Sequence, residues 1–323
     1  MKRFSVLIIL AIILVSCIPQ RLPRASDRNV FLSPVYQGYW SPLFGVELDL
    51  LGGQLTAGQM QNIRDVHTRI IRTWILYERI PAAMLGYNLE LLDDAGITII
   101  AAVKGNSCWI DESAYPEFMT WLEQTVKDYP QVDIWEIWNE PEIGGCIPPY
   151  FGGWASQGVD TYIRFLNQAY DTIKSVNPSA KVMPGSFCLC FPDDDPNWQF
   201  VEQVIKQGRF DVIGIHHYAV YPSNLLNEIG KLDSNVKRIR NYMGSDVKPI
   251  YLDETSAIIP VAMLPEGCTD GFQDYQVDWL EKLTDYTRLA NVSSLIWYGL
   301  YIDWQCSGMS GKEVEQAAME EWR

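Results

Sequence analysis

The sequence predicts one domain of the α/β class, a closed barrel of eight strand–helix units. Eight short runs of apolar and β-branched residues recur along the 323 residues, and segments with helical spacing lie between them. Strands that alternate with helices are parallel, and nearly continuous apolar strands suit a sheet that is buried on both faces. Eight such units in a chain of this length favour a (β/α)8 TIM barrel over an open, doubly wound sheet.

The expected elements follow from residue type and spacing. The strands are the apolar runs, at residues 44–50, 69–76, 97–103, 132–139, 180–185, 211–218, 248–254 and 293–299. The helices have the spacing of one apolar face, at residues 57–67, 115–128, 160–176, 198–207, 225–243, 275–289 and 312–322. Tyr129-Pro130 and Asn177-Pro178 stop two of these helices. No Gly-x-Gly-x-x-Gly or Gly-Lys-Ser/Thr loop follows a strand, which argues against dinucleotide or P-loop nucleotide binding.

Composition and charge narrow the classes of partner. Apolar residues make up 48% and charged residues 20% of the chain, which suits a large core and argues against disorder. The formal net charge of −15 disfavours nucleic acid as a partner, because a phosphate backbone needs basic patches. The same charge disfavours acidic polysaccharides less strongly, and it also promotes solubility.

The N-terminus has the pattern of an export signal. Lys2 and Arg3 form a basic region, and an apolar region follows at residues 6–15 that is too short to span a membrane comfortably. Leu-Val-Ser-Cys at 14–17 resembles a bacterial lipoprotein cleavage box, in which Cys17 takes the lipid. The alternative is an ordinary secretory signal that is cut nearby.

These features predict the domain boundaries and the location of the protein. We expect a lipoprotein signal peptide at residues 1–17, a proline-containing tether at 18–36 and the barrel at 37–323. The protein would then be extracytoplasmic and a monomer, with contact to the membrane only through its lipid anchor. It would be secreted if the lipoprotein box is not used.

The cysteines suggest disulfides in the loops of one barrel face. Without Cys17, six cysteines are left, an even number that favours disulfides in an exported protein but allows 15 connectivities. All six follow a strand and precede the next helix. Loop neighbours suggest the pairs 108–146 and 268–306, which leave Cys188 with Cys190 in a short, strained ring. A metal site at that Cys-x-Cys is the alternative, disfavoured because none of the three histidines is near.

The strand at 132–139 ends in an amide and a carboxylate. Residues 132–142 read Val-Asp-Ile-Trp-Glu-Ile-Trp-Asn-Glu-Pro-Glu, so Asn139 and Glu140 stand where a turn is usual. Trp135 and Trp138 partly desolvate the carboxylate, which favours its protonated form and suits it to donate a proton. Aromatic faces also stack on the apolar faces of sugar rings.

A second carboxylate, Glu254, ends the strand at 248–254. In a barrel, Glu140 and Glu254 would face each other across the mouth. Two carboxylates can cleave a glycosidic bond if one protonates the leaving oxygen while the other stays ionised and attacks the anomeric carbon. The residue pattern therefore predicts glycoside hydrolysis.

Other strands offer side chains to the same mouth. Alternation places Arg72 and Trp74 on one face of their strand, and His216 and Tyr218 on one face of theirs. Arg72 would keep a neighbouring nucleophile ionised. Trp297, near the end of the last strand, would form a stacking floor for the sugar. Glu47 and Asp49 are further candidate ligands.

Several of these motifs together resemble a known group of enzymes. Trp-Asn-Glu-Pro at 138–141, His-x-Tyr at 216–218 and Pro-Ile-x-x-x-Glu at 249–254 resemble clan A retaining glycoside hydrolases. The stretch WEIWNEPE, followed by AYDTIKSVNPSAKVMPGS, is most similar to family 39, with family 5 next. The resemblance spans roughly residues 40 to 305 and lies mainly at strand ends.

The resemblance implies a role for each matched residue. Glu140 would be the general acid/base and Glu254 the nucleophile of a retaining double displacement. Asn139 would hold the sugar 2-hydroxyl. The remaining four would act on nucleophile and substrate: Arg72, His216 and Tyr218 by orienting them, and Trp297 by lining the −1 subsite.

The chain departs from that pattern beside the nucleophile. Asp253 precedes Glu254 where relatives often carry Thr or Ser, and Thr255 follows where an aromatic residue is common. A second carboxylate would favour the neutral form of the nucleophile, unless Asp253 points out of the barrel, as alternation predicts. Glu136 shares the parity of Glu140, so we expect it deeper in the barrel, paired with Arg72.

The sequence thus predicts a hydrolase of β-linked oligo- or polysaccharides that needs no metal or organic cofactor, because two carboxylates suffice. One alternative is a non-catalytic glycan-binding lipoprotein on the same barrel, which the presence of both glutamates disfavours. Another is a metal-dependent hydrolase, which the scarcity of histidine disfavours.

Overall fold

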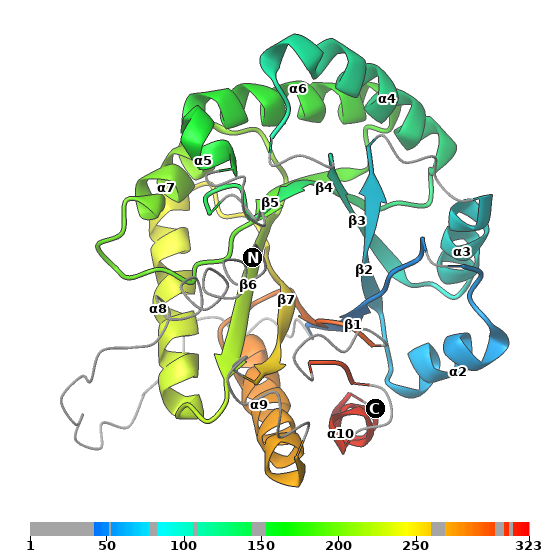
Figure 1. The fold of residues 1–323 in the computed structure, drawn as a ribbon, viewed down its shortest axis with the longest axis vertical. Helices are drawn as coiled ribbons and strands as arrows, with labels where there is room; N and C mark the ends of the chain where they lie inside the picture. The colour runs from blue at the N-terminus through cyan, green and yellow to red at the C-terminus, as the bar shows by residue number, and fades with distance from the viewer. Residues whose placement is uncertain are drawn as a thin grey trace, which may run out of the picture.

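The structure is a computed structural model, which describes residues 42–51, 53–77, 83–105, 109–143, 153–259, 269–300, 307–309 and 313–322. Within these ranges, eight parallel strands form one sheet in the order β5-β4-β3-β2-β1-β8-β7-β6. A bridge between Phe187 and Ile215 brings its two edges together and nearly closes the ring. Figure 1 shows this ring of strands with the helices around it. The predicted (β/α)8 barrel is confirmed.

The strands lie close to the predicted runs. Their bounds are β1 Leu43–Glu47, β2 Ile70–Leu76, β3 Thr98–Lys104, β4 Ile134–Asn139, β5 Lys181–Ser186, β6 Ile213–Val220, β7 Ile250–Ile258 and β8 Ser294–Trp297. The largest differences are at β7, which continues four residues beyond the predicted end, and at β1, which ends three residues before the predicted end.

The helices alternate with the strands. They are α2 Ala57–Asp65, α3 Ala83–Asp94, α4 Tyr115–Asp128, α5 Gly153–Gln157, α6 Val159–Val176, α7 Asn197–Gln207, α8 Leu225–Met243, α9 Asp270–Leu289 and α10 Glu313–Glu321, with a 3-10 turn η1 at Glu112–Ala114. The sequence did not predict α3 and the short α5. None of the helices in the described ranges is both long and apolar enough to cross a membrane.

Local signals fix several helix ends. A capping box opens α2, in which Thr56 accepts a hydrogen bond from the backbone of Gln59 and the Gln59 side chain accepts one from Thr56. The side chain of Asn224 caps the first turn of α8. Helices α4 and α6 end just before Tyr129-Pro130 and Asn177-Pro178, as predicted.

The inside of the barrel has an apolar end and a charged end. Near the strand starts, one buried cluster consists of Ile70, Ile100, Ile134, Met183, Val212, Tyr251 and Ile296. Two residues later along β2 and β4, the inward positions hold Arg72 and Glu136, both fully buried. The apolar cluster therefore fills the lower barrel, and the charged side chains gather where the strands end.

Strand β7 contains a bulge that decides where two carboxylates point. Ile215 of β6 pairs with Leu252, yet the next residue, His216, pairs with Glu254, so Asp253 is an extra residue in β7. A bulge of this kind interrupts alternation and lets adjacent side chains face the same side. Asp253 is fully buried and faces the barrel interior with Glu254. The prediction that Asp253 points outward is therefore wrong.

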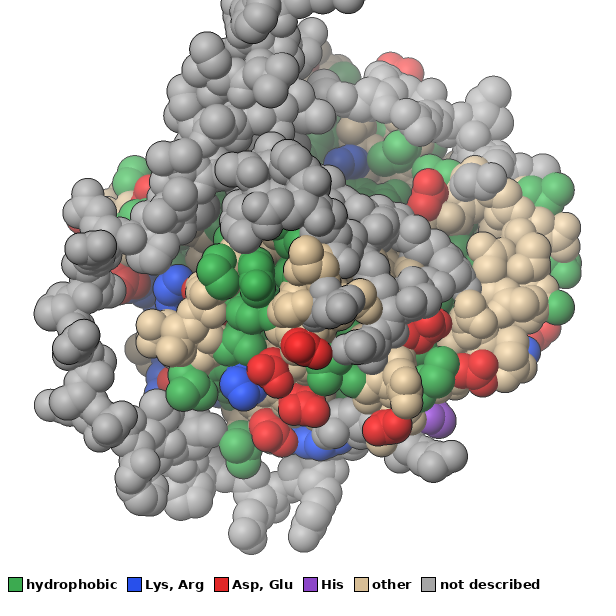
Figure 2. All heavy atoms as spheres, turned by 60° about the horizontal axis from the view of Figure 1, so that its bottom comes forward, with side chains coloured by type: hydrophobic (Ala, Val, Ile, Leu, Met, Phe, Trp, Pro, Cys, Tyr) green, Lys and Arg blue, Asp and Glu red, His purple; other side chains and the backbone are tan. Residues whose placement is uncertain are grey.

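The surface reflects the acidic composition. On the face that Figure 2 brings forward, Asp and Glu side chains gather beside Lys and Arg side chains. Such mixing of signs is typical of a solvated surface. The predicted signal peptide, tether and Cys17 lie outside the described residues, as do four other cysteines: Cys108, Cys146, Cys268 and Cys306.

Candidate active site

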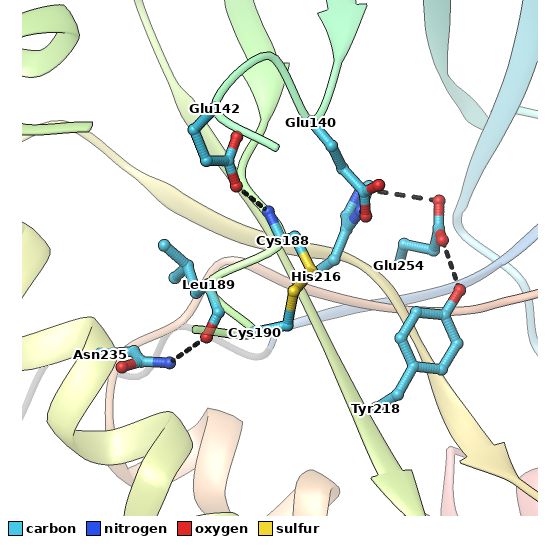
Figure 3. The surroundings of a disulfide bond; sticks show 9 residues. All are labelled: Glu140, Glu142, Cys188, Leu189, Cys190, His216, Tyr218, Asn235 and Glu254. Carbon is cyan, nitrogen blue, oxygen red and sulfur yellow. Dashed lines mark hydrogen bonds and ion pairs between the residues drawn. A yellow bond between two sulfur atoms is a disulfide. The ribbon is translucent and has the colours of Figure 1, made fainter. Parts of the chain in front are cut away.

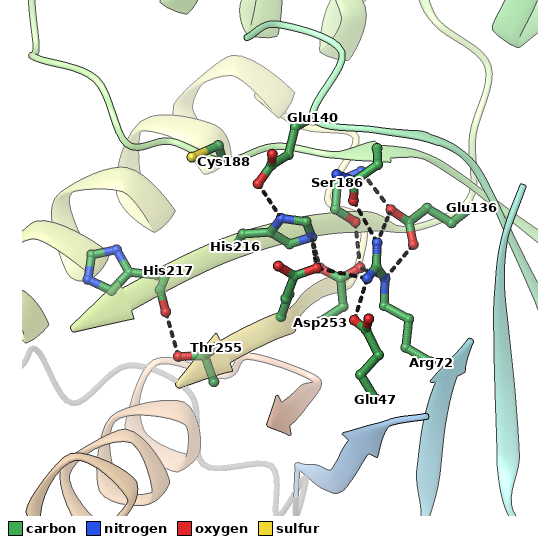
Figure 4. Close-up of polar contacts among 12 residues, drawn as sticks. Glu47, Arg72, Glu136, Glu140, Ser186, Cys188, His216, His217, Asp253 and Thr255 are labelled. Atoms are coloured by element: carbon green, nitrogen blue, oxygen red, sulfur yellow. Dashed lines mark hydrogen bonds and ion pairs between the residues drawn. The ribbon is translucent and has the colours of Figure 1, made fainter. Parts of the chain in front are cut away.

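Arg72 lies at the centre of a buried polar network at the carboxyl ends of the strands (Figure 4). Its guanidinium donates two hydrogen bonds to Glu136, at 2.7 and 3.0 Å, which confirms the predicted pairing. It also donates to Glu47 at 2.6 Å and to Glu254 at 2.8 Å. A further bond, of 2.8 Å, reaches Oδ1 of Asn139. Arg72 therefore joins strands β1, β4 and β7 through one planar group.

Glu254 is held as an anion by several neighbours. Arg72 contacts its Oε2, and the Tyr218 hydroxyl donates to its Oε1. Nε2 of His216 lies 3.6 Å from Oε2. Burial alone would raise the pKa of Glu254, but the charges of His216 and Arg72 outweigh burial and lower it. The arrangement suits a carboxylate that must stay ionised.

Glu140 has fewer partners and more contact with solvent. Its side chain is 18% exposed, against 11% for that of Glu254. Oε1 of Glu140 lies 2.8 Å from Nδ1 of His216 (Figure 4). The backbone of Glu140 has φ 45°, and that of Trp138 has φ 82°. Strand β4 therefore ends in an unusual backbone conformation that aims the carboxylate at the mouth.

The two carboxylates lie close together. One oxygen of Glu140 and one oxygen of Glu254 are within 4.8 Å of each other, and a ring nitrogen of His216 lies within the same distance of both. The sequence predicted that the two glutamates would face each other, and the structure brings them together.

His216 bridges the two carboxylates and is fully buried. Burial on its own lowers the pKa of His216, but Glu254 and the hydrogen bond to Glu140 oppose burial and raise the pKa to about 10. At neutral pH the ring is therefore an imidazolium with a proton on each nitrogen: Nδ1–H donates to Glu140, and Nε2–H faces Glu254 without a hydrogen bond. The adjacent His217 faces the helix layer, where its ring lies 5.9 Å from that of Trp279.

Two more buried carboxyls stand close to this group. Burial raises the pKa of Glu47 to about 7, against the lowering effect of Arg72. Burial and Glu136 raise the pKa of Asp253 to about 7. Both carboxyls are therefore easier to protonate than Glu254, whose pKa is lowered. The other candidate on the first predicted strand, Asp49, is exposed and accepts a hydrogen bond from the backbone of Leu51.

Trp297 does not take its predicted place. Its side chain has no exposed surface and donates from Nε1 to the carbonyl of Ser307 at 2.8 Å. It packs with the outward-facing core, whereas its neighbour Ile296 belongs to the interior cluster. The next inward residue is Tyr298, whose ring lies 6.0 Å from that of Tyr218. Tyr298, rather than Trp297, therefore presents an aromatic ring to the mouth.

Lys104 is a site residue that the sequence analysis missed. It is the last residue of β3, and its Nζ lies 4.4 Å from the ring centroid of Trp74. The guanidinium of Arg72 lies 4.5 Å from the same ring, whose Nε1 donates to Glu47. Burial lowers the pKa of Lys104, and Arg72 lowers it further. A lysine directly after the apolar run at 97–103 was the available signal.

The loop after β5 contains the disulfide between Cys188 and Cys190. The sequence disfavoured this pair because the ring is short, but Leu189 has φ 51°, and this turn brings the two Cα atoms to 5.2 Å. The Cys188 backbone donates to Glu142 at 2.6 Å. Burial, followed by the charge of Glu140, raises the pKa of Glu142 to about 8. Figure 3 shows the disulfide beside the catalytic glutamate candidates.

Among the residues that the structure describes, two groups of side chains have ligand atoms close enough together to hold a cation. They are Glu136, His216 and Asp253, and Glu140, His216 and Glu254, with atoms within 4.8 Å in each group. The charges of Arg72 and His216 already account for the close approach of these carboxylates. The geometry therefore does not require a metal ion.

Known proteins share the fold of this chain. No protein-family model matches the sequence, and no protein of curated function matches it. A glucosidase from Croceicoccus marinus has a TM-score of 0.67 at 14% identity, over 88% of this chain and 67% of that one. An endo-1,4-beta-D-mannanase from Thermotoga petrophila has a TM-score of 0.61 at 13% identity, over 87% and 99%. A beta-D-glucuronidase from Dictyoglomus thermophilum has a TM-score of 0.57 at 16% identity, over 87% and 50%. The barrel is thus one that glycosidases use.

Proposed function

We propose that this protein is a retaining glycoside hydrolase that cleaves β-glycosidic bonds, with Glu140 as general acid/base and Glu254 as nucleophile. The observation that carries the proposal is the approach of the two carboxylates to within 4.8 Å. Retaining enzymes hold their carboxyl groups roughly 5–5.5 Å apart, whereas inverting enzymes need about 6.5–9.5 Å to admit a water molecule.

In the first step, a Glu254 oxygen forms a bond to the anomeric carbon while the bond from that carbon to the leaving oxygen breaks. The proton of the Glu140 carboxyl passes to the leaving oxygen. The electron pair of the Glu254 carboxylate ends in an ester, so Glu254 becomes neutral and Glu140 becomes an anion. Arg72 and Tyr218, which contact Glu254, hold it in position for attack.

In the second step, water attacks the anomeric carbon and gives a proton to the Glu140 carboxylate. The ester bond breaks, and its electron pair returns to Glu254. Two inversions at one carbon give overall retention. Every proton and electron pair is accounted for by the two glutamates, the sugar and water, so the cycle needs no cofactor.

The neighbouring side chains would form the sugar subsite. Asn139, held by Arg72, offers its amide beside the acid/base, as the 2-hydroxyl position requires. Tyr298 and Trp74 offer aromatic surface at the mouth, in place of the expected Trp297. The fold is shared with proteins described as a glucosidase, a mannanase and a glucuronidase, so a carbohydrate with a β-linkage is the substrate class we propose.

Export is part of the same proposal. The disulfide at Cys188–Cys190 supports an oxidising compartment, because such bonds are rare in reducing cytosol. We propose that the protein acts outside the cytoplasm, attached through Cys17, on glycans that reach the cell surface.

Labelling the nucleophile tests the function. Aryl β-glycosides, together with β-glucans, mannans and xylans, are screened for hydrolysis. A 2-fluoro glycoside of the sugar that responds is then added, and the peptides are mapped by mass spectrometry. We expect one glycosyl group on Glu254 and release of the β-anomer as first product. A label on another residue, release of the α-anomer, or no hydrolysis in the whole set would contradict the proposal.

A further inference from the structure

Three features of the barrel interior make room for the side chain of Asp253. The bulge in β7 turns it inward, and its Oδ2 accepts a hydrogen bond from Ser186 at 2.5 Å. On the neighbouring strand β6, Gly214 leaves the space: a Cβ at that position would lie 2.8 Å from Asp253 Oδ2 and 1.9 Å from Ser186 Oγ. A buried carboxylate is costly, and three separate features here accommodate it.

The other oxygen of Asp253 faces His216. Oδ1 lies 3.8 Å from Nε2 of His216, and within the described residues neither atom has a hydrogen-bond partner. The same Nε2 lies 3.6 Å from Oε2 of Glu254. One N–H of the imidazolium therefore stands between two carboxylates at nearly equal distances, while the opposite nitrogen contacts Glu140 at 2.8 Å.

We propose that Asp253 is a positioning residue that keeps the proton on His216 during the second half of the reaction. The proposal rests on the retaining mechanism described above. In the free protein, Glu254 supplies the negative charge that faces Nε2. Once Glu254 is in an ester it has no charge, and Asp253 is then the carboxylate that faces Nε2.

A proton that stays on His216 keeps Glu140 ionised, so that Glu140 can act as the base in the second step. After the first step, Glu140 is an anion beside Nδ1–H of His216, and it must accept a proton from water rather than from the ring. A negative charge at Nε2 stabilises the imidazolium, so its proton stays on Nδ1. Without Asp253 the proton would move to Glu140 and remove the base that the second step needs. No proton has to leave His216 at any point in the cycle.

The electrostatics agree with a transfer of charge between the two carboxyls. In the free protein, the pKa of Glu254 is lowered and the pKa of Asp253 is raised to about 7, so Glu254 is the charged member. Neutralising Glu254 removes a like charge from the site, which favours ionisation of Asp253. Arg72, whose Nε lies 3.6 Å from Asp253 Oδ2, supports the anion from the other side.

Steady-state kinetics of Asp253→Asn separate the two steps. With an aryl glycoside of good leaving-group ability, kcat reports the second step and kcat/KM the first. We expect kcat to fall about tenfold, KM to fall by a similar factor and kcat/KM to stay within about twofold. The glycosyl-enzyme should accumulate and be visible in the intact mass.

The outcomes distinguish a positioning role from a structural one. Equal losses of kcat and kcat/KM, or no change in either, would overturn the proposal for Asp253. Asp133→Asn is the matched control: it removes an Asp from the opposite end of the barrel and should leave both constants unchanged. If the wild-type protein forms no ester on Glu254, the retaining mechanism fails with it; if the ester forms and the variant behaves as wild type, only the role of Asp253 fails.

A measurement on the wild-type protein does not depend on the folding of any variant. The chain has three histidines, so nitrogen-15 labelling of histidine gives three pairs of ring signals that can be assigned. We expect the His216 pair to have imidazolium shifts both in the free protein and after trapping with the 2-fluoro glycoside. Conversion of that pair to the pattern of a neutral ring in the trapped protein would overturn the proposal.

Discussion

Glu140, directly after β4, and Glu254, in the middle of β7, present the same functional group in two different settings. Glu254 on β7 contacts Arg72, Tyr218 and His216, whereas Glu140 on β4 contacts His216 and is more exposed. A carboxylate surrounded by cations and a phenol is held ionised, which suits a nucleophile, whereas the more exposed carboxylate can be reached by a leaving group and by water. The difference in neighbours, not in residue type, therefore separates the two proposed roles.

The two strands also reach this result by different backbone means. Strand β4 ends with positive φ values at Trp138 and Glu140. Strand β7 instead inserts one extra residue, so that Asp253 and Glu254 both face inward. Both devices interrupt a regular strand where a carboxylate must be aimed, which is typical of functional sites.

The largest effect on activity is expected from replacing Glu254, the carboxylate that several side chains hold in place. Glu254→Gln keeps the shape of the side chain but removes the nucleophile, so kcat/KM should fall on the order of 10⁴-fold or more. Hydrolysis of an aryl β-glycoside gives the rate, and circular dichroism checks that the fold is kept. Glu202→Gln, a surface change in α7, is the control. If Glu254→Gln keeps activity within tenfold of wild type, Glu254 is not the nucleophile.

Replacing Glu140 should have a smaller effect on activity, and the size of the effect should depend on the substrate. Glu140→Ala should lower kcat/KM by about 10²–10⁴-fold for glycosides whose leaving group needs a proton. The loss should be much smaller for leaving groups that depart as stable anions. Azide, a small nucleophile that needs no general base, should restore turnover and give a β-glycosyl azide.

The dependence on the leaving group is what distinguishes the two glutamates. If Glu140→Ala lowers kcat/KM equally for all substrates and azide has no effect, Glu140 is not the general acid/base. Azide that restores Glu254→Ala with an α-glycosyl azide as product would, by contrast, be consistent with the assignment of β7, since the azide then attacks in place of the nucleophile.

Removing a single hydrogen bond to Glu254 should have a moderate effect on activity. Tyr218→Phe removes the hydroxyl that donates to Glu254. A hydrogen bond to a charged group contributes roughly 1.5–3 kcal/mol, so kcat/KM should fall about 10- to 100-fold. Tyr275→Phe removes a hydroxyl that contacts Ser223, away from the two glutamates, and should change kcat/KM by less than about twofold. Equal effects of the two changes would show that the contact with Glu254 carries no special weight.

Much of the site could be predicted because barrel strands end at one face. Knowing which strands carry Glu140 and Glu254 was enough to place them opposite each other, and the pairing of Arg72 with Glu136 followed from parity alone. These contacts depend on the fold and on alternation, both of which the sequence pattern records.

The parts that could not be predicted depend on local departures from alternation. One extra residue in β7 reverses the expected direction of Asp253. Strand β8 has four residues, all buried, so no polar–apolar alternation indicates that Tyr298 rather than Trp297 faces the mouth. Lys104 was missed because its strand runs one residue past the apolar run. In each case, a shift of one position changes which side chain reaches the sugar.

The smallest expected effect concerns stability at the β4 end. Burial raises the pKa of Glu142 from 4.5 to about 8, so the folded protein keeps a proton that the unfolded chain loses. The stability that this proton contributes is present in full below about pH 4.5 and is lost as the pH rises towards about 8. Glu142→Gln cannot lose a proton. Relative to that variant, the wild-type protein should therefore lose at least about 1 kcal/mol of unfolding free energy between about pH 5 and pH 8.

Urea unfolding of both proteins across this pH range measures the difference. The contributions of Glu47, Asp253 and His216, whose pKa values are also raised, are common to both proteins and cancel in the comparison. Glu90→Gln, an exposed change in α3, should follow the wild-type pH dependence. Parallel curves for wild type and Glu142→Gln would mean that Glu142 is ionised in the folded state. Burial of Glu142 would then make no contribution to the pH dependence of stability at the β4 end.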